Sequence, residues 1–146
     1  MRKSKLYSMV LVALLLSLTF SPQMATAAEI PLRASDYIDV FRASAQPIGY
    51  GLVRIDFQIA GTSVMNQLGA SEIQIKEKTG ASWTTVRTYR HESYPDLMGQ
   101  NVLRHTGSIT FPGIAGRTYV AHITFYAANT KGSETQVITT SSVTAY

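Results

Sequence analysis

The stretch GIAGRTYVAHITFYAANTKGSETQVITT, residues 113–140, decides the fold that this chain is predicted to adopt. Its centre alternates between two rows of side chains, a period of two that places one apolar row on one face of a β-strand. Residues 129–132, Asn-Thr-Lys-Gly, tolerate turn dihedrals, and a second β-prone run follows at 135–138. The sequence therefore predicts a β-hairpin built on a central strand. The apolar row is Tyr119, Ala121, Ile123, Phe125 and Ala127.

Tyr119 has a second predicted role at the start of this strand. It lies two residues past Ala-Gly-Arg, where strands of β-sandwiches commonly begin with a tyrosine whose hydroxyl bonds backwards to the main chain. We therefore expect Tyr119 to be a structural corner residue that bonds a main-chain group in or just before residues 112–115.

The first residues of the 146-residue chain have the features of a secretory signal peptide. Three basic residues precede an apolar run at 9–20, and Ala25-Thr26-Ala27 offers small residues where a signal peptidase cuts. A membrane anchor is the competing interpretation, but the run is shorter than the roughly 18 to 20 residues that cross a bilayer. Residues 1–27 are thus predicted to be a signal peptide, with cleavage after Ala27 or, as the next choice, after Ala28.

The rest of the chain is predicted to be a short linker and one domain. Residues 28–35 contain Pro31 and no periodicity, which is typical of a linker, and residues 36–146 have the length of a single domain. Secretion into the extracellular medium or association with the cell envelope follows from the leader, and no membrane anchor is expected after cleavage.

Charge and cysteine content exclude several functions. Three of the thirteen basic residues lie in the leader while all nine acidic residues lie beyond it, so the mature protein has a net charge of +1. The basic excess of the whole chain is therefore no indication of nucleic-acid binding. Without cysteine, the chain has neither a disulfide nor a thiolate metal site nor a cysteine nucleophile. We expect no cofactor and no metal.

Seven strands are expected in the domain, because alternating runs recur between turn signals without any long helical period. An antiparallel β-sandwich of the immunoglobulin-like (fibronectin type III-like) class fits this all-β pattern best, with a barrel as the alternative. Pro47 is expected to end the first strand, and residues 61–69 and 90–99 are expected to be loops. The expected strands are 37–45, 52–59, 72–78, 83–89, 103–111, 119–127 and 135–138.

The inward faces of these strands define the predicted core. We expect Trp83 to cap one end of it, with a bulge in its strand if Val86 is buried as well. The core is predicted to contain Val53, Ile55, Phe57, Ile59, Ile73, Ile75, Ile109, Tyr119, Ile123 and Phe125.

Two resemblances support the architecture. AGRTYVAHITFYAANTKGS, residues 115–133, resembles the penultimate strand and last hairpin of fibronectin type III domains. The succession SDYIDVF, GASEIQIKEKTGASWTTV, MGQN and AGRTYVAHITFYAAN is similar to a family of small secreted proteins from Gram-positive, clostridium- or bacillus-like bacteria. That likeness implies the fold and secretion, and no activity. The chain departs from fibronectin modules in placing Trp83 after the third strand, and its hairpin turn carries no Arg-Gly-Asp motif.

Catalytic chemistry is not predicted. The conceivable metal or acid–base set is His91, His105 and His122 with Glu92 and Asp96, but these lie on different faces and elements and are not expected to converge. No G-x-S-x-G motif is present, and the aspartates are spread over separate elements. A small secreted hydrolase therefore remains only the remote alternative.

The predicted function is a secreted, non-catalytic module that binds a protein or a cell-envelope polysaccharide. Loops on a rigid scaffold vary without disturbing its core, so residues 61–69 and 90–99 are the expected sites. Tyr94, Leu97 and Met98 are the candidate interaction residues, since an aromatic and two apolar side chains have the composition of a hot spot. The alternative is a carbohydrate-binding module that stacks sugars on Tyr50, Trp83, Tyr89 and Tyr126.

Overall fold

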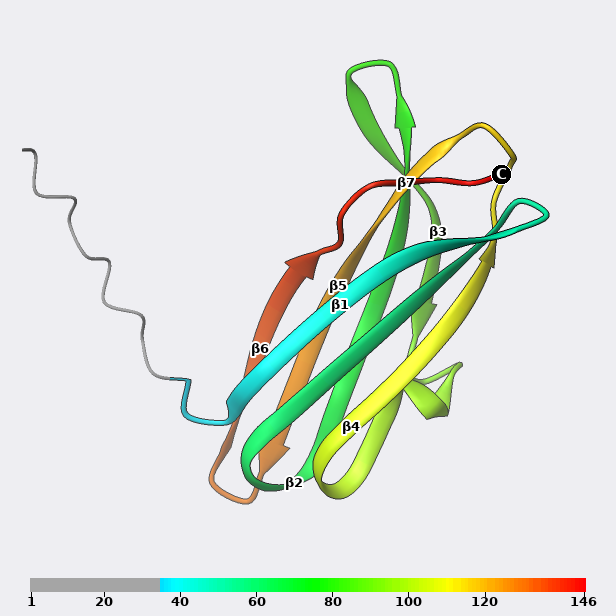
Figure 1. Ribbon diagram of the computed structural model, residues 1–146. Helices are drawn as coiled ribbons and strands as arrows, with labels where there is room; N and C mark the ends of the chain where they lie inside the picture. Colours follow the sequence, from blue (N-terminus) through cyan, green and yellow to red (C-terminus); the bar gives the residue numbers. More distant parts are fainter. Residues whose placement is uncertain (1–34) are drawn as a thin grey trace, which may run out of the picture. The chain divides into compact units, whose positions relative to one another are not determined.

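The computed structural model describes residues 35–146, so the predicted signal peptide and nearly all of the predicted linker lie outside the described residues (Figure 1). This part is an all-β structure in which every strand pairing is antiparallel. One short 3-10 helix, η1 (Pro95–Leu97), interrupts the strands. The strands are β1 (Ile38–Gly49), β2 (Leu52–Thr79), β3 (Ser82–Arg90), β4 (Met98–Pro112), β5 (Thr118–Asn129), β6 (Gly132–Thr139) and β7 (Val143–Thr144).

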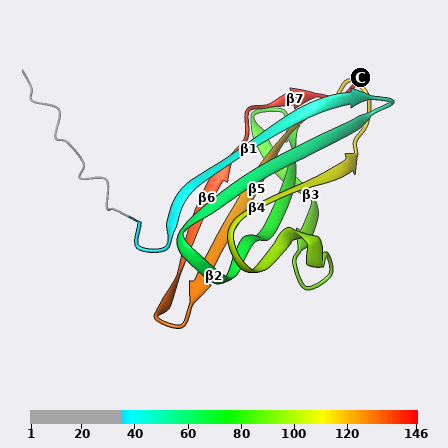
Figure 2. The same cartoon turned by 60° about the horizontal axis from the view of Figure 1, so that its bottom comes forward.

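The long strand β2 belongs to two groups of strands. Its first half, residues 52–61, lies between β1 and β4. In its second half, residues 67–77 pair with β5 and residues 72–79 pair with β3. The strand β6 extends the second group beside β5, and β7 pairs with the start of β5. Both views show the first group lying across β5 and β6 (Figure 1; Figure 2).

Aromatic rings join the two groups across the core. The Phe125 ring on β5 lies 5.9 Å from the Phe57 ring on β2 and 5.7 Å from the Phe41 ring on β1, measured between ring centroids. Phe57 and Phe125 are buried, and Phe41 packs against the same cluster. A single hydrogen-bonded sheet therefore folds into two layers, with the apolar core between them.

The expectation of a loop at 61–69 is wrong. This segment is part of β2: Met65 pairs with Val102 and Leu68 with Gly99, after a register shift that follows Ala60. Met65 and Leu68 are fully buried. The run Gly-Thr-Ser has loop composition, but Gly61 pairs with Ile38 and the Thr62 N–H donates to the Tyr37 oxygen at 3.0 Å. Pairing with β4 resumes at Met65, so the chain crosses between the layers without leaving the sheet.

Gly69 allows the helix η1 to pack against this crossing. A Cβ atom at this position would collide with the main-chain carbonyl group of Leu97. Leu97 itself is buried and belongs to the core cluster. Glycine is therefore required here for close approach of two backbones.

Two further boundaries differ from the expectation. Pro47 does not end the first strand, because β1 continues to Gly49 with Pro47 opposite Val53. Among the described strands β1 pairs only with β2, and an edge strand tolerates the missing N–H of proline. The short β7 was not expected, since two residues carry no periodic signal.

The predicted core is largely confirmed. Nine of the ten expected residues are buried, and Ile109 is half-buried against the same cluster. Trp83 is 41% exposed, so the expectation that it caps the core is wrong. The strand β3 does carry a bulge at Val86, but Val86 is exposed as well, because the β2–β3 hairpin extends beyond the end of the core.

The predicted tyrosine corner is confirmed. The main-chain N–H of Ile114 donates a hydrogen bond of 2.9 Å to the hydroxyl oxygen of Tyr119. The Tyr119 ring is buried and meets Phe111 edge to face at 5.1 Å. The bond therefore fixes the β4–β5 connection onto the strand that it leads into.

We expect Tyr119→Phe to lower the free energy of unfolding by about 0.5 to 1.5 kcal/mol, because it removes one partly buried hydrogen bond and keeps the ring. Chemical denaturation of the purified protein measures this loss. Tyr126→Phe, on the opposite face of the same strand, is the matched control. Equal stability of the two variants would show that the corner bond contributes nothing.

The start of the described chain is held by Glu134 on β6. Its carboxylate accepts hydrogen bonds from the Ser35 hydroxyl at 2.6 Å, the Tyr37 N–H at 3.0 Å and the Gln136 side chain at 2.8 Å. Burial tends to raise the pKa of Glu134, but these bonds outweigh it and hold the pKa below its usual value. The charged carboxylate thus anchors the entry to β1.

Because its folded-state pKa is lowered, Glu134 stabilises the fold above the usual glutamate pKa of about 4.3 and loses this effect as pH falls through the lower folded value. We expect Glu134→Gln to cost about 1 to 3 kcal/mol at pH 7, and the difference from the natural protein to shrink as the pH falls below the usual glutamate pKa of about 4.3. Chemical denaturation at a series of pH values measures this difference in the free energy of unfolding, and Glu92→Gln, which replaces an exposed glutamate, is the control. A cost independent of pH would contradict the anchoring role of the charge.

Candidate functional site

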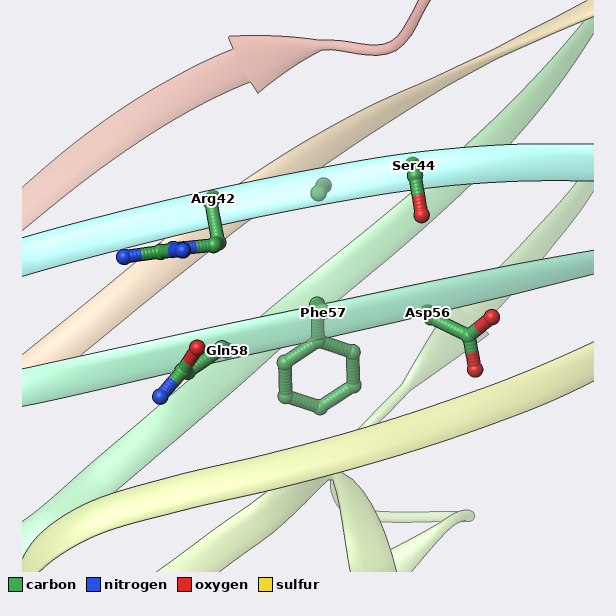
Figure 3. Close-up of a pocket in the computed structure, with 6 residues that line it drawn as sticks. Arg42, Ser44, Asp56, Phe57 and Gln58 are labelled. Atoms are coloured by element: carbon green, nitrogen blue, oxygen red, sulfur yellow. The ribbon is translucent and has the colours of Figure 1, made fainter.

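A hollow of about 240 Å³ lies over the β1–β2 pair and is open to solvent (Figure 3). Arg42 and Gln58 lie at one end of it and Ser44 and Asp56 at the other, in agreement with the register of the two strands. Its wall is completed by Ala43 and Phe57.

The polar groups of this hollow suit binding better than catalysis. The Asp56 carboxylate accepts a hydrogen bond of 2.8 Å from the Nε of Arg54, so its charge is already engaged. The lining contains no histidine and no second carboxylate. These side chains can bond polar groups of a ligand, but they do not form a general acid–base pair.

The three histidines are held in separate places. His91 lies beside the main-chain oxygen of Ser71, and the His105 Nε2 is 3.0 Å from the main-chain oxygen of Asp96. On β5, burial and the nearby charge of Lys76 lower the pKa of His122. Within residues 35–146 no three side chains of the ligand types histidine, cysteine, aspartate and glutamate are placed to hold a metal ion.

The expected binding loop at 90–99 is only partly accessible. Leu97 is 2% exposed and belongs to the core, so it is not available to a partner in this structure. Met98 is half-buried where β4 begins, opposite Gly69. Tyr94 remains 38% exposed and packs edge to face on Tyr89 at 5.1 Å. The composition of this segment predicted a hot spot, but Leu97 is buried in the core and Met98 is half-buried, so little of their apolar surface is accessible to a partner.

The four predicted sugar-stacking residues do not form a common platform. Tyr89 is buried and Tyr126 is half-buried, whereas Tyr50 and Trp83 are exposed on different hairpins. The ring pairs in the described part of the chain are tilted by 50° to 71°, and none of them joins two exposed candidates. A sugar would therefore find single rings rather than a flat aromatic surface.

Three segments that are distant in sequence meet at one end of the domain, where the C-terminal residues lie beside the β1–β2 turn (Figure 1). The Gly51 N–H donates to the Tyr146 main-chain oxygen at 2.8 Å, and the Gly113 N–H donates to the Gly51 oxygen at 3.0 Å. The Gly116 N–H donates to the Ala145 oxygen at 2.8 Å. These bonds join the segments into one rigid end.

Large apolar side chains stand exposed on this end. We call them the apical patch: Ile48, Tyr50, Ile114 and Tyr146, which are 46%, 100%, 56% and 69% exposed. Of the four, only Tyr50 was a candidate from the sequence. Ile114 and Tyr146 could not be found there, because only the main-chain bonds between distant segments bring them beside the β1–β2 turn.

Tyr50 also has an unfavourable backbone conformation. Its φ of 54° lies in the left-handed region, between Gly49 at 87° and Gly51 at 76°. A left-handed non-glycine residue typically costs about 1 to 2 kcal/mol, and such residues cluster at functional sites. The Tyr50 ring is fully exposed, so no packing within the domain offsets this strain. It is therefore the best candidate for a binding side chain.

Comparisons with known proteins leave this site to be interpreted on its own geometry. The described residues include no helix that has both the length and the apolar character needed to span a membrane. No protein-family model, no curated protein and no solved structure matches this chain.

Proposed function

We propose that this protein is a secreted, non-catalytic binding domain that contacts a protein or a cell-envelope polysaccharide through the apical patch. The single observation that carries the proposal is Tyr50, a fully exposed aromatic residue in a strained left-handed turn. Tyrosine is among the residues that dominate binding energy at interfaces. Secretion rests on the leader-like N-terminal sequence, which the basic and apolar residues at 2–20 support.

We further propose that the domain belongs to the immunoglobulin-like, fibronectin type III-like class. In that architecture strands C, F and G share one sheet while A, B and E lie in the other. In this assignment strand A would be β1, strand B the first half of β2, and strand E would be β4. In the other sheet, strand C would be the second half of β2, strand F would be β5, and strand G would be β6. The corner bond of Tyr119 supports the assignment. The exposed Trp83 departs from the buried tryptophan of immunoglobulin domains.

The rigidity of the end supports its use in binding. The bonds among the segments around Gly51, Gly113 and Gly116 fix the main chain that carries the patch. A surface held in one conformation loses little entropy when a partner binds. An exposed apolar patch on a fixed scaffold is therefore well suited to a binding site.

Carbohydrate binding remains the second candidate, because Tyr50 and Tyr146 are two exposed phenol rings at the same end. The hollow near Asp56 adds hydrogen-bonding groups of the kind that sugar hydroxyls use, on the outer face of the β1–β2 pair. Binding of the purified protein to a panel of polysaccharides, peptidoglycan and envelope proteins distinguishes carbohydrate binding from protein binding.

Tyr50→Asn is expected to separate binding from stability. Asparagine tolerates the left-handed conformation, so the free energy of unfolding should rise by about 0.5 to 1 kcal/mol. Loss of a hot-spot ring should lower the affinity for the partner identified in the panel by about thirtyfold. Titration of the partner and chemical denaturation measure the two effects.

Tyr94→Ala is the matched control, since it removes a partly exposed tyrosine outside the apical patch. Unchanged affinity of Tyr50→Asn, or loss of affinity in Tyr94→Ala alone, would place the binding site elsewhere. Hydrolysis of any polymer in the panel that disappears when a histidine is replaced would overturn the non-catalytic proposal.

A further inference from the structure

We propose that the β2–β3 hairpin is a second interaction surface, which docks on an anionic lipid surface. It presents Trp83 to the membrane interface and Lys76 and Lys78 to the lipid headgroups. This inference does not rest on the apical patch.

The register of the hairpin places these three side chains on one face. Trp83 lies opposite Lys78, and Thr85 lies opposite Lys76. Directly opposed residues of antiparallel strands point to the same face, as do residues two apart on one strand. Figure 1 shows the tip of this hairpin standing away from the other strands. Lys78 and Trp83 lie beyond the last pairing of β2 with β5 and are exposed, whereas Lys76 still pairs with Val120 and is half-buried.

The positive charge on this face is not neutralised by the glutamate between the two lysines. Glu77 points to the opposite face, where it lies opposite the buried Tyr119 and forms an ion pair with Arg117. The next acid along β2, Glu72, is bonded to Arg90. An anionic surface therefore meets two lysines without an intervening carboxylate.

Apolar exposure on the same hairpin favours a lipid surface over a soluble polyanion. Trp83 is 41% exposed and Val86, at the bulge of β3, is 44% exposed. A polyanion would engage the lysines and leave these apolar groups in water. Tryptophan prefers the headgroup region of a bilayer, and lysine side chains there can extend their charge to the lipid phosphates.

The chain carries its own probe, because Trp83 is its single tryptophan. Fluorescence of the secreted protein should shift to the blue with vesicles of phosphatidylcholine and phosphatidylglycerol, and not with phosphatidylcholine alone. Salt should weaken the partition, since the attraction is electrostatic. Co-sedimentation with the same vesicles measures the bound fraction independently of fluorescence.

Each lysine near an anionic surface contributes about a fivefold change in partition, so Lys76→Gln with Lys78→Gln should lower it more than tenfold. The control is Lys131→Gln in the β5–β6 turn, which removes one positive charge away from the hairpin and should leave partition unchanged. Trp83→Ser should also reduce co-sedimentation. Unfolding midpoints of all variants show whether the fold is intact.

Three results would overturn the proposal. The first is equal partition to vesicles with and without phosphatidylglycerol. The second is a double lysine variant that is folded and binds as the natural protein does. The third is binding to soluble polyphosphate that matches vesicle binding and causes no blue shift, which would identify a polyanion site instead.

Discussion

The structure depends on one constraint, which is that β2 must run unbroken through both layers of the sheet. Its first half requires β1 and β4 as neighbours, and its second half requires β3 and β5. The bend between them is tolerated because β4 turns with it and because Gly69 lets the backbone at Leu97 approach closely. The contact of Phe57 with Phe125 then closes the core between the layers.

This arrangement explains why the candidate functional surfaces lie at the ends of the domain. Residues between the layers are committed to the core, which includes apolar residues that looked available for binding, such as Leu97 and Tyr89. At the β1–β2 end the chain runs past the core, and main-chain bonds among three segments hold Tyr50 in place. The β2–β3 hairpin extends beyond the core as well and leaves Trp83 in solvent.

Sequence patterns predicted local features well and long-range features poorly. Alternation identified the inward rows around Ile55 and Ile123, because each strand buries one face regardless of its partners. The Tyr119 corner bond spans five residues and was equally predictable. The crossing at 61–69 was mistaken for a loop, since its pairing with β4 joins positions 29 to 37 residues apart.

The sequence by itself determined that residues 35–146 form antiparallel β-structure, which side chains point inward on most strands, and how Tyr119 turns the chain into β5. These features depend on the period of the side chains and on neighbouring residues. Only the tertiary structure decided the exposure of Trp83 and the assembly of the apical patch from Tyr50, Ile114 and Tyr146. Exposure is decided by where the core ends and by which distant segments meet there, and no local pattern carries that information.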